Sequence, residues 1–408
     1  MSNVNTLSAR QPAPAVESQG TYNYAMGYLR GFIVLLVVAH HAALAYHPFA
    51  PPPPVSLTAV PRWWQAFPVV DTMRGDWASL FTGFNDNFFM ALMFFLSGLF
   101  VWNGLKNKGG AGFLRGRVLR LGLPFVVAAA IVAPLAYYPT YLQTPGHTGF
   151  DGFVRQWLSL GVWPAGPAWF IWVLAVFDCI AALLYALSSR WAETLGRFLA
   201  GPQSRPARFF TLLSIATAVV YIPLELTYSG LAWAAFGPFT FQTARILLYL
   251  FYFLAGVGIG AWGLARGPLM PQGKLARRWL LWAMASIVVF LVMTTVAIAF
   301  ITAHLLSRNW EIATDVLFAA SCAASSFAFL SLFLRFARSR SSLFGSLSRN
   351  SYGIYLVHYA FVSWLQLALV GASLPAALKL TVVTCGAVAG SWLLTSTLRR
   401  VPAVARVV

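Results

Sequence analysis

Two ionisable side chains, Arg30 and His41, lie in one apolar run, YLRGFIVLLVVAHHAALAYHPF at 28–49. An α-helix turns about 100° per residue, so a spacing of eleven brings both side chains to within about 20° of one helix face. Their axial separation of about 16 Å excludes direct contact. His40 is rotated about 80° away from Arg30. The spacing therefore predicts one polar path along the helix, marked by Arg30 and His41.

A neutral imidazole has the near-neutral pKa that a general base needs. Ionisable groups at membrane depth are costly and usually face a protein interior or a water-filled cavity. In the alternative interpretation, Arg30 is a positive anchor at the inner interface and His41 is an ordinary residue of the outer interface. The two residues alone leave both interpretations open.

The composition places these residues in a membrane protein. The chain has 408 residues, of which 59% are hydrophobic and 9% charged, and its mean hydropathy is +0.71. These values are typical of polytopic membrane proteins. The net charge of +18 lies in the short gaps between apolar runs, so it indicates topology and not nucleic-acid binding. No His, Asp and Glu set has the spacing of metal ligands on one helix, so no metal is predicted.

A membrane-spanning helix needs about 20 apolar residues. Ten stretches meet this and predict an all-α, polytopic fold: 28–46, 83–102, 121–138, 164–187, 209–228, 241–264, 279–305, 312–334, 350–371 and 376–398. Twenty-one of the 28 Lys and Arg residues fall on one side, which predicts cytoplasmic termini. Arg30, Arg245 and Lys379 belong to the helices. We expect a disordered cytoplasmic tail at 1–22, one transmembrane domain at 23–400 and a cytoplasmic tail at 401–408.

Arg30 and His41, with ten residues between them, resemble the R-x10-H signature of the acyltransferase-3 family of integral membrane O-acyltransferases. Further segments resemble this family, in order: NFFMALMFFLSGLFVWNGL (87–105), RGRVLRLGLPF (115–125), GPAWFIWVL (166–174) and NSYGIYLVHYAFV (350–362). The second of these resembles the family's basic inner loop. The resemblance covers roughly 28–398. The runs at 83–100 and 350–362 most resemble the subgroup that includes glucans biosynthesis protein C.

The resemblance implies that the chain is an acyltransferase for groups other than aminoacyl groups. It would move an acetyl or succinyl group from cytoplasmic acyl-CoA to a hydroxyl of an extracytoplasmic glycan or glycolipid. The expected location is the bacterial cytoplasmic (inner) membrane. His41 would act as general base or as a transient acyl acceptor, with Arg30 on the same helix.

The remaining site residues are predicted by their chemistry and position. Guanidinium groups bind phosphate in bidentate fashion, which favours a coenzyme A site at three arginines, Arg115, Arg117 and Arg120. A catalytic histidine needs an orienting partner, and by depth the candidate carboxylates are Asp86 and Asp315.

The acceptor cavity is expected to be lined by Trp169, Tyr355 and His358. Tyr355 and His358 are three residues apart and share a helix face. Aromatic side chains near membrane interfaces are also common as belt anchors, which is the alternative for these positions.

Two other functions remain possible from the sequence. A transporter or flippase would use the same polar cavity without covalent chemistry. A scaffold or sensor would bind a partner through the external loops, but it would leave the intramembrane Arg30 and His41 without a purpose.

Overall fold

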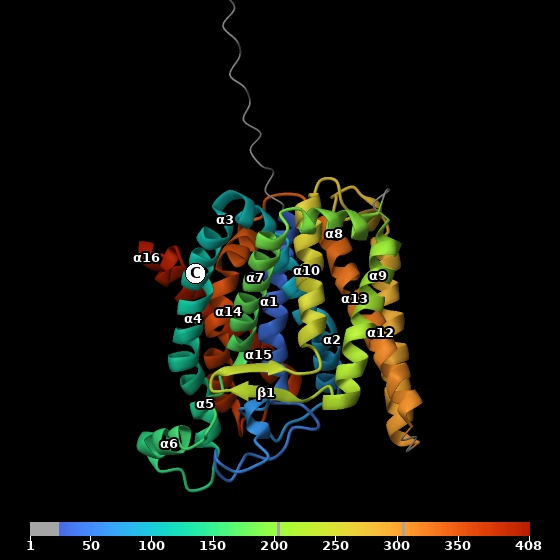
Figure 1. Ribbon diagram of the computed structural model, residues 1–408. Coiled ribbons are helices and arrows are strands. Elements are labelled where there is room, and N and C mark those ends of the chain that lie inside the picture. The colour runs from blue at the N-terminus through green and yellow to red at the C-terminus, as the bar shows by residue number, and fades with distance from the viewer. Residues whose placement is uncertain (1–23, 202–204, 304–306) are drawn as a thin grey trace, which may run out of the picture.

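The long helices run side by side as a bundle, with shorter elements at its two ends (Figure 1). The computed structural model describes residues 24–201, 205–303 and 307–408. The long helices are α1 (Tyr24–Leu44), α2 (Asp76–Gly98), α7 (Trp169–Leu187), α9 (Pro206–Tyr228), α10 (Ile246–Trp262), α12 (Trp279–Thr302), α13 (Arg308–Phe336), α14 (Ser342–Leu369) and α15 (Ala376–Leu398). The predicted tail at 1–22 lies outside the described residues.

Each of the ten predicted stretches contains helix in the structure, which confirms the all-α, polytopic membrane fold. Among the described residues, eight helices are long and apolar enough to cross a membrane. The other two predicted spans correspond to α10, which has only 17 residues, and to α2, which carries Asp76 and Asp86.

The segment Val101–Leu142 has 42 residues and is helical on both sides of a break at Gly109, where the sequence predicts a basic inner loop before residue 121. It consists of α3 (Val101–Arg117), α4 (Leu123–Val127) and α5 (Ala133–Leu142), joined by π-helical segments η2 (Val118–Gly122) and η3 (Ala128–Val132). The loop prediction was therefore wrong for 115–120, which is helical, whereas the predicted span at 121–138 is helical throughout. The turn of this segment comes earlier, at Gly109, whose φ of +66° is readily adopted only by glycine.

The two ends of the bundle differ in composition. The end that carries α3 and α8 (Trp191–Ala200) is called the basic end here, because the sequence places most of its Lys and Arg there (Figure 1). The short helix α16 (Pro402–Ala405), within the predicted C-terminal tail, also lies toward this end (Figure 1). The opposite, far end carries α6 (Gly149–Leu158), the hairpin of β1 (Trp233–Phe236) and β2 (Phe239–Gln242), and the loop at 45–75 with η1 (Trp63–Gln65) (Figure 1).

The contact between α2 and α10 is unusually close because glycines meet the facing backbone. A Cβ at Gly98 would lie 2.2 Å from the carbonyl oxygen of Phe253, and one at Gly256 would lie 2.1 Å from that of Phe95. Small residues of this kind let membrane helices approach closely. The contact fixes the relative position of the two helices and of the side chains near their far ends.

The far-end loop, residues 45–75, is fastened to the bundle by a buried ion pair. Nζ of Lys379 on α15 lies 2.7 Å from Oδ2 of Asp71, and both side chains are almost fully buried. Gln143 adds two hydrogen bonds to the backbone of Val70, each 3.0 Å long. The loop is therefore an ordered part of the far end.

Candidate active site

The central feature of the site is a pair of histidines from α1 and α14. Nδ1 of His41 lies 3.3 Å from Nε2 of His358 and 2.8 Å from the carbonyl oxygen of Val37. Nδ1 of His358 lies 2.7 Å from the carbonyl oxygen of Tyr355. His358 is fully buried and His41 is partly buried.

These contacts assign the hydrogens of both rings. A carbonyl oxygen only accepts, so each Nδ1 must carry the hydrogen that it donates to Val37 or Tyr355. His358 then presents a lone pair on Nε2 toward Nδ1–H of His41. His41 keeps its own lone pair on Nε2. Nδ1 of His41 is thus held by a carbonyl and by a second imidazole, and the lone pair of the ring lies on Nε2.

Neighbouring side chains hold His41 in place. The ring of Tyr359 meets it edge to face, with ring centroids 5.0 Å apart. Gln366 donates from Nε2 to the carbonyl oxygens of His41 and Ala42, both at 3.0 Å. These carbonyls belong to the last turn of α1, where no later helical N–H is available to pair with them. Tyr359 fixes the plane of the His41 imidazole, and Gln366 fixes the backbone of His41.

Five helices form a ring around this level of the bundle. α1 packs against α2 and α14, α2 packs against α10, and α10 packs against α7. The ring is completed by η4 (Gly166–Ala168), the turn before α7, which packs against α14. Aromatic contacts continue across it: Phe94 lies 5.1 Å from Tyr249 and 4.5 Å from Phe170, between ring centroids, and Phe170 lies 5.7 Å from Tyr355.

Asp86 lies in this ring but does not pair with His41 as predicted. Its Oδ2 accepts a hydrogen bond of 2.7 Å from Nη1 of Arg245, at the start of α10. The same Nη1 donates to the carbonyl oxygen of Asp86 at 3.0 Å. A carboxylate in such an ion pair interacts mainly with the arginine, so Asp86 does not orient the ring of His41. The group that contacts His41 is His358, and the other carboxylate candidate, Asp315, lies beside Glu225.

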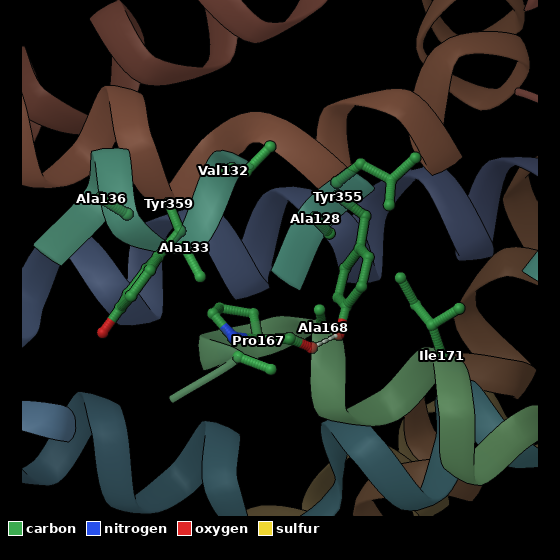
Figure 2. A pocket seen from close by; sticks show the side chains of 11 residues that line it. Ala128, Val132, Ala133, Ala136, Pro167, Ala168, Ile171, Tyr355 and Tyr359 are labelled. Carbon is green, nitrogen blue, oxygen red and sulfur yellow. Dashed lines mark hydrogen bonds between the residues drawn. The ribbon is translucent and has the colours of Figure 1, made fainter. Parts of the chain in front are cut away.

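The predicted acceptor residues are brought together by α7 and α14. Trp169 is buried and its ring meets Trp233 edge to face, with centroids 5.5 Å apart. The hydroxyl of Tyr355 donates to the carbonyl oxygen of Pro167, across a narrow crevice shown in Figure 2. Alanines of η3 and α5 line the opposite wall of this crevice, and Tyr359 closes one end of it (Figure 2). Tyr355 and His358 therefore lie next to His41, and Trp169 is linked to Tyr355 through the ring of Phe170.

The arginines predicted to bind phosphate lie near the basic end. Arg115 and Arg120 are exposed, whereas Arg117 turns inward and places Nε 2.9 Å from Oδ2 of Asp178 on α7. Arg30 is exposed near the start of α1. The structure thus separates these cations from the histidine pair along the bundle, as the helical spacing of Arg30 and His41 predicts.

Sequence reasoning missed Tyr359, Gln366 and Asp178 as parts of these sites. Tyr359 and Gln366 share a helix with His358, and Gln366 lies eight positions beyond it, rotated by about 80° around the helix. Asp178 is the single charge inside the apolar run of α7, which is a recognisable signal. In the part of the chain that the structure describes, no three His, Cys, Asp or Glu side chains form a group that could hold a metal.

The described helices form a polytopic membrane protein that encloses a histidine pair and carries arginines toward one end. Residues 23–396 match the model of the acyltransferase-3 family, an acyltransferase domain. The chain therefore belongs to this family and is a membrane acyltransferase. No curated protein and no solved structure shows a significant match to it.

Proposed function

We propose that this protein is an O-acyltransferase that moves an acyl group from cytoplasmic acyl-CoA to a hydroxyl at the extracytoplasmic face. Its membership of the acyltransferase-3 family supplies the reaction class. The observation that carries the rest is the contact of His41 with His358 and Val37, which leaves Nε2 of His41 as a base.

In the proposed reaction, Nε2 of His41 takes the proton of the acceptor hydroxyl as its oxygen attacks the thioester carbonyl. The C–S bond then breaks, and His41 returns the proton to the sulfur of coenzyme A, so that the ester and free thiol are the products. While His41 is an imidazolium, its Nδ1–H donates more strongly to the Val37 carbonyl and to Nε2 of His358. Both contacts therefore favour the charged state that forms during the reaction.

The donor is proposed to enter from the basic end. Arg115, Arg117 and Arg120 would bind the phosphates of acetyl-CoA or succinyl-CoA, and Arg30 would add a cation on α1. The positive-inside rule places this end in the cytoplasm, where acyl-CoA is found. The bacterial cytoplasmic membrane is the proposed location.

The acceptor is proposed to be a glycan or glycolipid that approaches from the far end. Trp169 and Tyr355 offer apolar faces to sugar C–H groups, and the Asp86–Arg245 pair offers an acceptor and a donor to hydroxyls. The side chain of Asp86 is 42% exposed although it pairs with a buried arginine, so it remains reachable. Here Asp86 contacts the acceptor and is not the orienting partner of His41. Membership of the subgroup that includes glucans biosynthesis protein C is likewise a prediction.

The test is turnover of radiolabelled acetyl-CoA and succinyl-CoA by reconstituted protein, with His41→Ala and His40→Ala as matched variants. His40 faces α2 through Phe89, with ring centroids 5.1 Å apart, so its loss removes a neighbouring imidazole but not the pair. We expect His41→Ala to lose about 100-fold or more of the rate and His40→Ala to keep most of it. Equal activity of all three proteins would refute His41 as the base. Acyl-CoA-independent movement of a lipid or solute would favour a transporter.

A further inference from the structure

Asp178 is a buried carboxylate within an apolar, membrane-spanning helix. It lies in the middle of α7, a helix long and apolar enough to span the membrane, and its side chain is fully buried. Neither of its carboxylate oxygens makes a hydrogen bond to any described residue. An ionised group in such a place is costly unless an opposite charge lies beside it.

Arg117 supplies that charge from the neighbouring helix. Its Nε lies 2.9 Å from Oδ2 of Asp178, and its guanidinium also lies over the ring of Phe113, 5.0 Å from the centroid. The contact is made through Nε, the nitrogen nearest the chain. The fork of the two terminal nitrogens, which is the part that binds phosphate in bidentate fashion, is therefore left for another oxyanion. The side chain of Arg117 is 25% exposed, so it can be reached.

The backbone around Arg117 is also special. The π-helical segment η2 begins at the next residue, Val118, and both α3 and η2 pack against α7. Segments of this kind are rare and frequently mark functional sites, because the extra residue re-aims the side chains next to it. Arg115 and Arg120 on either side are exposed, whereas Arg117 alone is turned inward and held. An arginine that served only as a topological anchor would need no buried carboxylate.

We propose that Asp178 is a positioning residue, which holds Arg117 so that its terminal nitrogens face the phosphate groups of the acyl-CoA donor. The inference rests on the proposed function, because it needs a phosphorylated donor at the basic end. Asp178 itself does not touch the donor. Its role is to restrict one long side chain to a single orientation before the donor arrives, which lowers the entropic cost of binding.

The experiment measures binding of coenzyme A and of pantetheine, which lacks the phosphates, to the full-length protein in detergent by calorimetry. Asp178→Asn keeps the size of the side chain and removes its charge. Removing a group that supports a metal ligand lowers metal affinity by about 10- to 100-fold. By the same reasoning, we expect Asp178→Asn to bind coenzyme A at least about tenfold more weakly than the wild type. Pantetheine binding should not change. Arg117→Ala should weaken coenzyme A binding similarly, and the double variant should lose little more.

The matched control is the double variant Asp71→Asn with Lys379→Met, which removes another buried carboxylate together with its counter-charge at the far end. It should leave coenzyme A affinity unchanged, and melting temperatures of all variants separate loss of fold from loss of binding. Should Asp178→Asn fail to fold, Asp178→Glu keeps the charge, displaces it by one methylene, and should bind coenzyme A with intermediate affinity.

Three results would overturn these proposals in distinguishable ways. Unchanged coenzyme A affinity in Asp178→Asn, with a loss in Arg117→Ala, refutes the positioning role and leaves the proposed function standing. Equal weakening of coenzyme A and pantetheine shows that Asp178 is structural only. No binding of coenzyme A by the wild type refutes the proposed donor and the inference together.

Discussion

Replacing Asp71 with asparagine is expected to destabilise the protein strongly, because it leaves the ammonium group of Lys379 buried without a counter-charge. The pair is 2.7 Å apart, with side-chain exposures of 1% for Asp71 and 0% for Lys379. Breaking a buried pair by removing one partner costs about 3–5 kcal/mol of unfolding free energy. The asparagine retains an oxygen for the 2.9 Å hydrogen bond from the N–H of Met73, so the change isolates the charge.

The assay is a double-mutant cycle with Lys379→Met, measured as unfolding free energy by detergent titration in mixed micelles. Each single variant should lose about 3–5 kcal/mol, and the double variant should recover most of this, because replacing both charges of a buried pair is often nearly neutral. Single losses of about 1 kcal/mol or less, as measured for exposed pairs, would refute the reasoning. So would a double variant whose loss equals the sum of the single losses.

Three further predictions concern the site, the packing and the far-end loop. His358→Phe should lower turnover about 10- to 100-fold with unchanged coenzyme A affinity, since it removes the acceptor for Nδ1–H of His41, and His358→Gln should keep more activity. Gly256→Leu should cost about 1–3 kcal/mol in the detergent titration by forcing α2 from α10, while Gly83→Ala, which meets no atom within 4 Å, should be neutral. Burial, reinforced by Arg74, lowers the pKa of His47 from 6.5, and its Nδ1 accepts from the Phe49 N–H. Its contribution to stability should thus be present above about pH 6.5 and lost as pH falls below that value, and melting temperatures of His47→Gln should lack this component.

Local patterns in the sequence predicted most of the fold. Apolar runs of about 20 residues define membrane helices because the bilayer sets their length, and a rotation of 100° per residue relates Arg30 to His41 without knowledge of any other helix. The basic residues at 115–120, just before the predicted span at 121–138, were predicted wrongly as a loop. Their charges suggested exposure, whereas a π-helical insertion lets the chain stay helical and turn one of its arginines inward.

The partner of His41 could not be predicted, because it depends on which helices become neighbours. Depth in the membrane suggested carboxylates, and Asp86 has a suitable depth, but α10 brings Arg245 to it. His358, 317 residues away from His41, was recognised only as a residue that lines the cavity. Arg245 and Lys379 were recognised as helix-borne charges, yet their counter-charges lie on distant segments of the chain.

The separation in sequence of these contacts has a consequence for biosynthesis. Lys379 lies 308 residues after Asp71, and it belongs to the last long helix. A chain whose synthesis stops before α15 would hold Asp71 without its counter-charge and would lack the support that closes the far end. Nearly the whole chain must therefore be synthesised before the histidine pair and the attachment of the far-end loop can form. A product that stops before α14 lacks His358 as well, so neither the buried ion pair nor the contact between the two histidines can form in it.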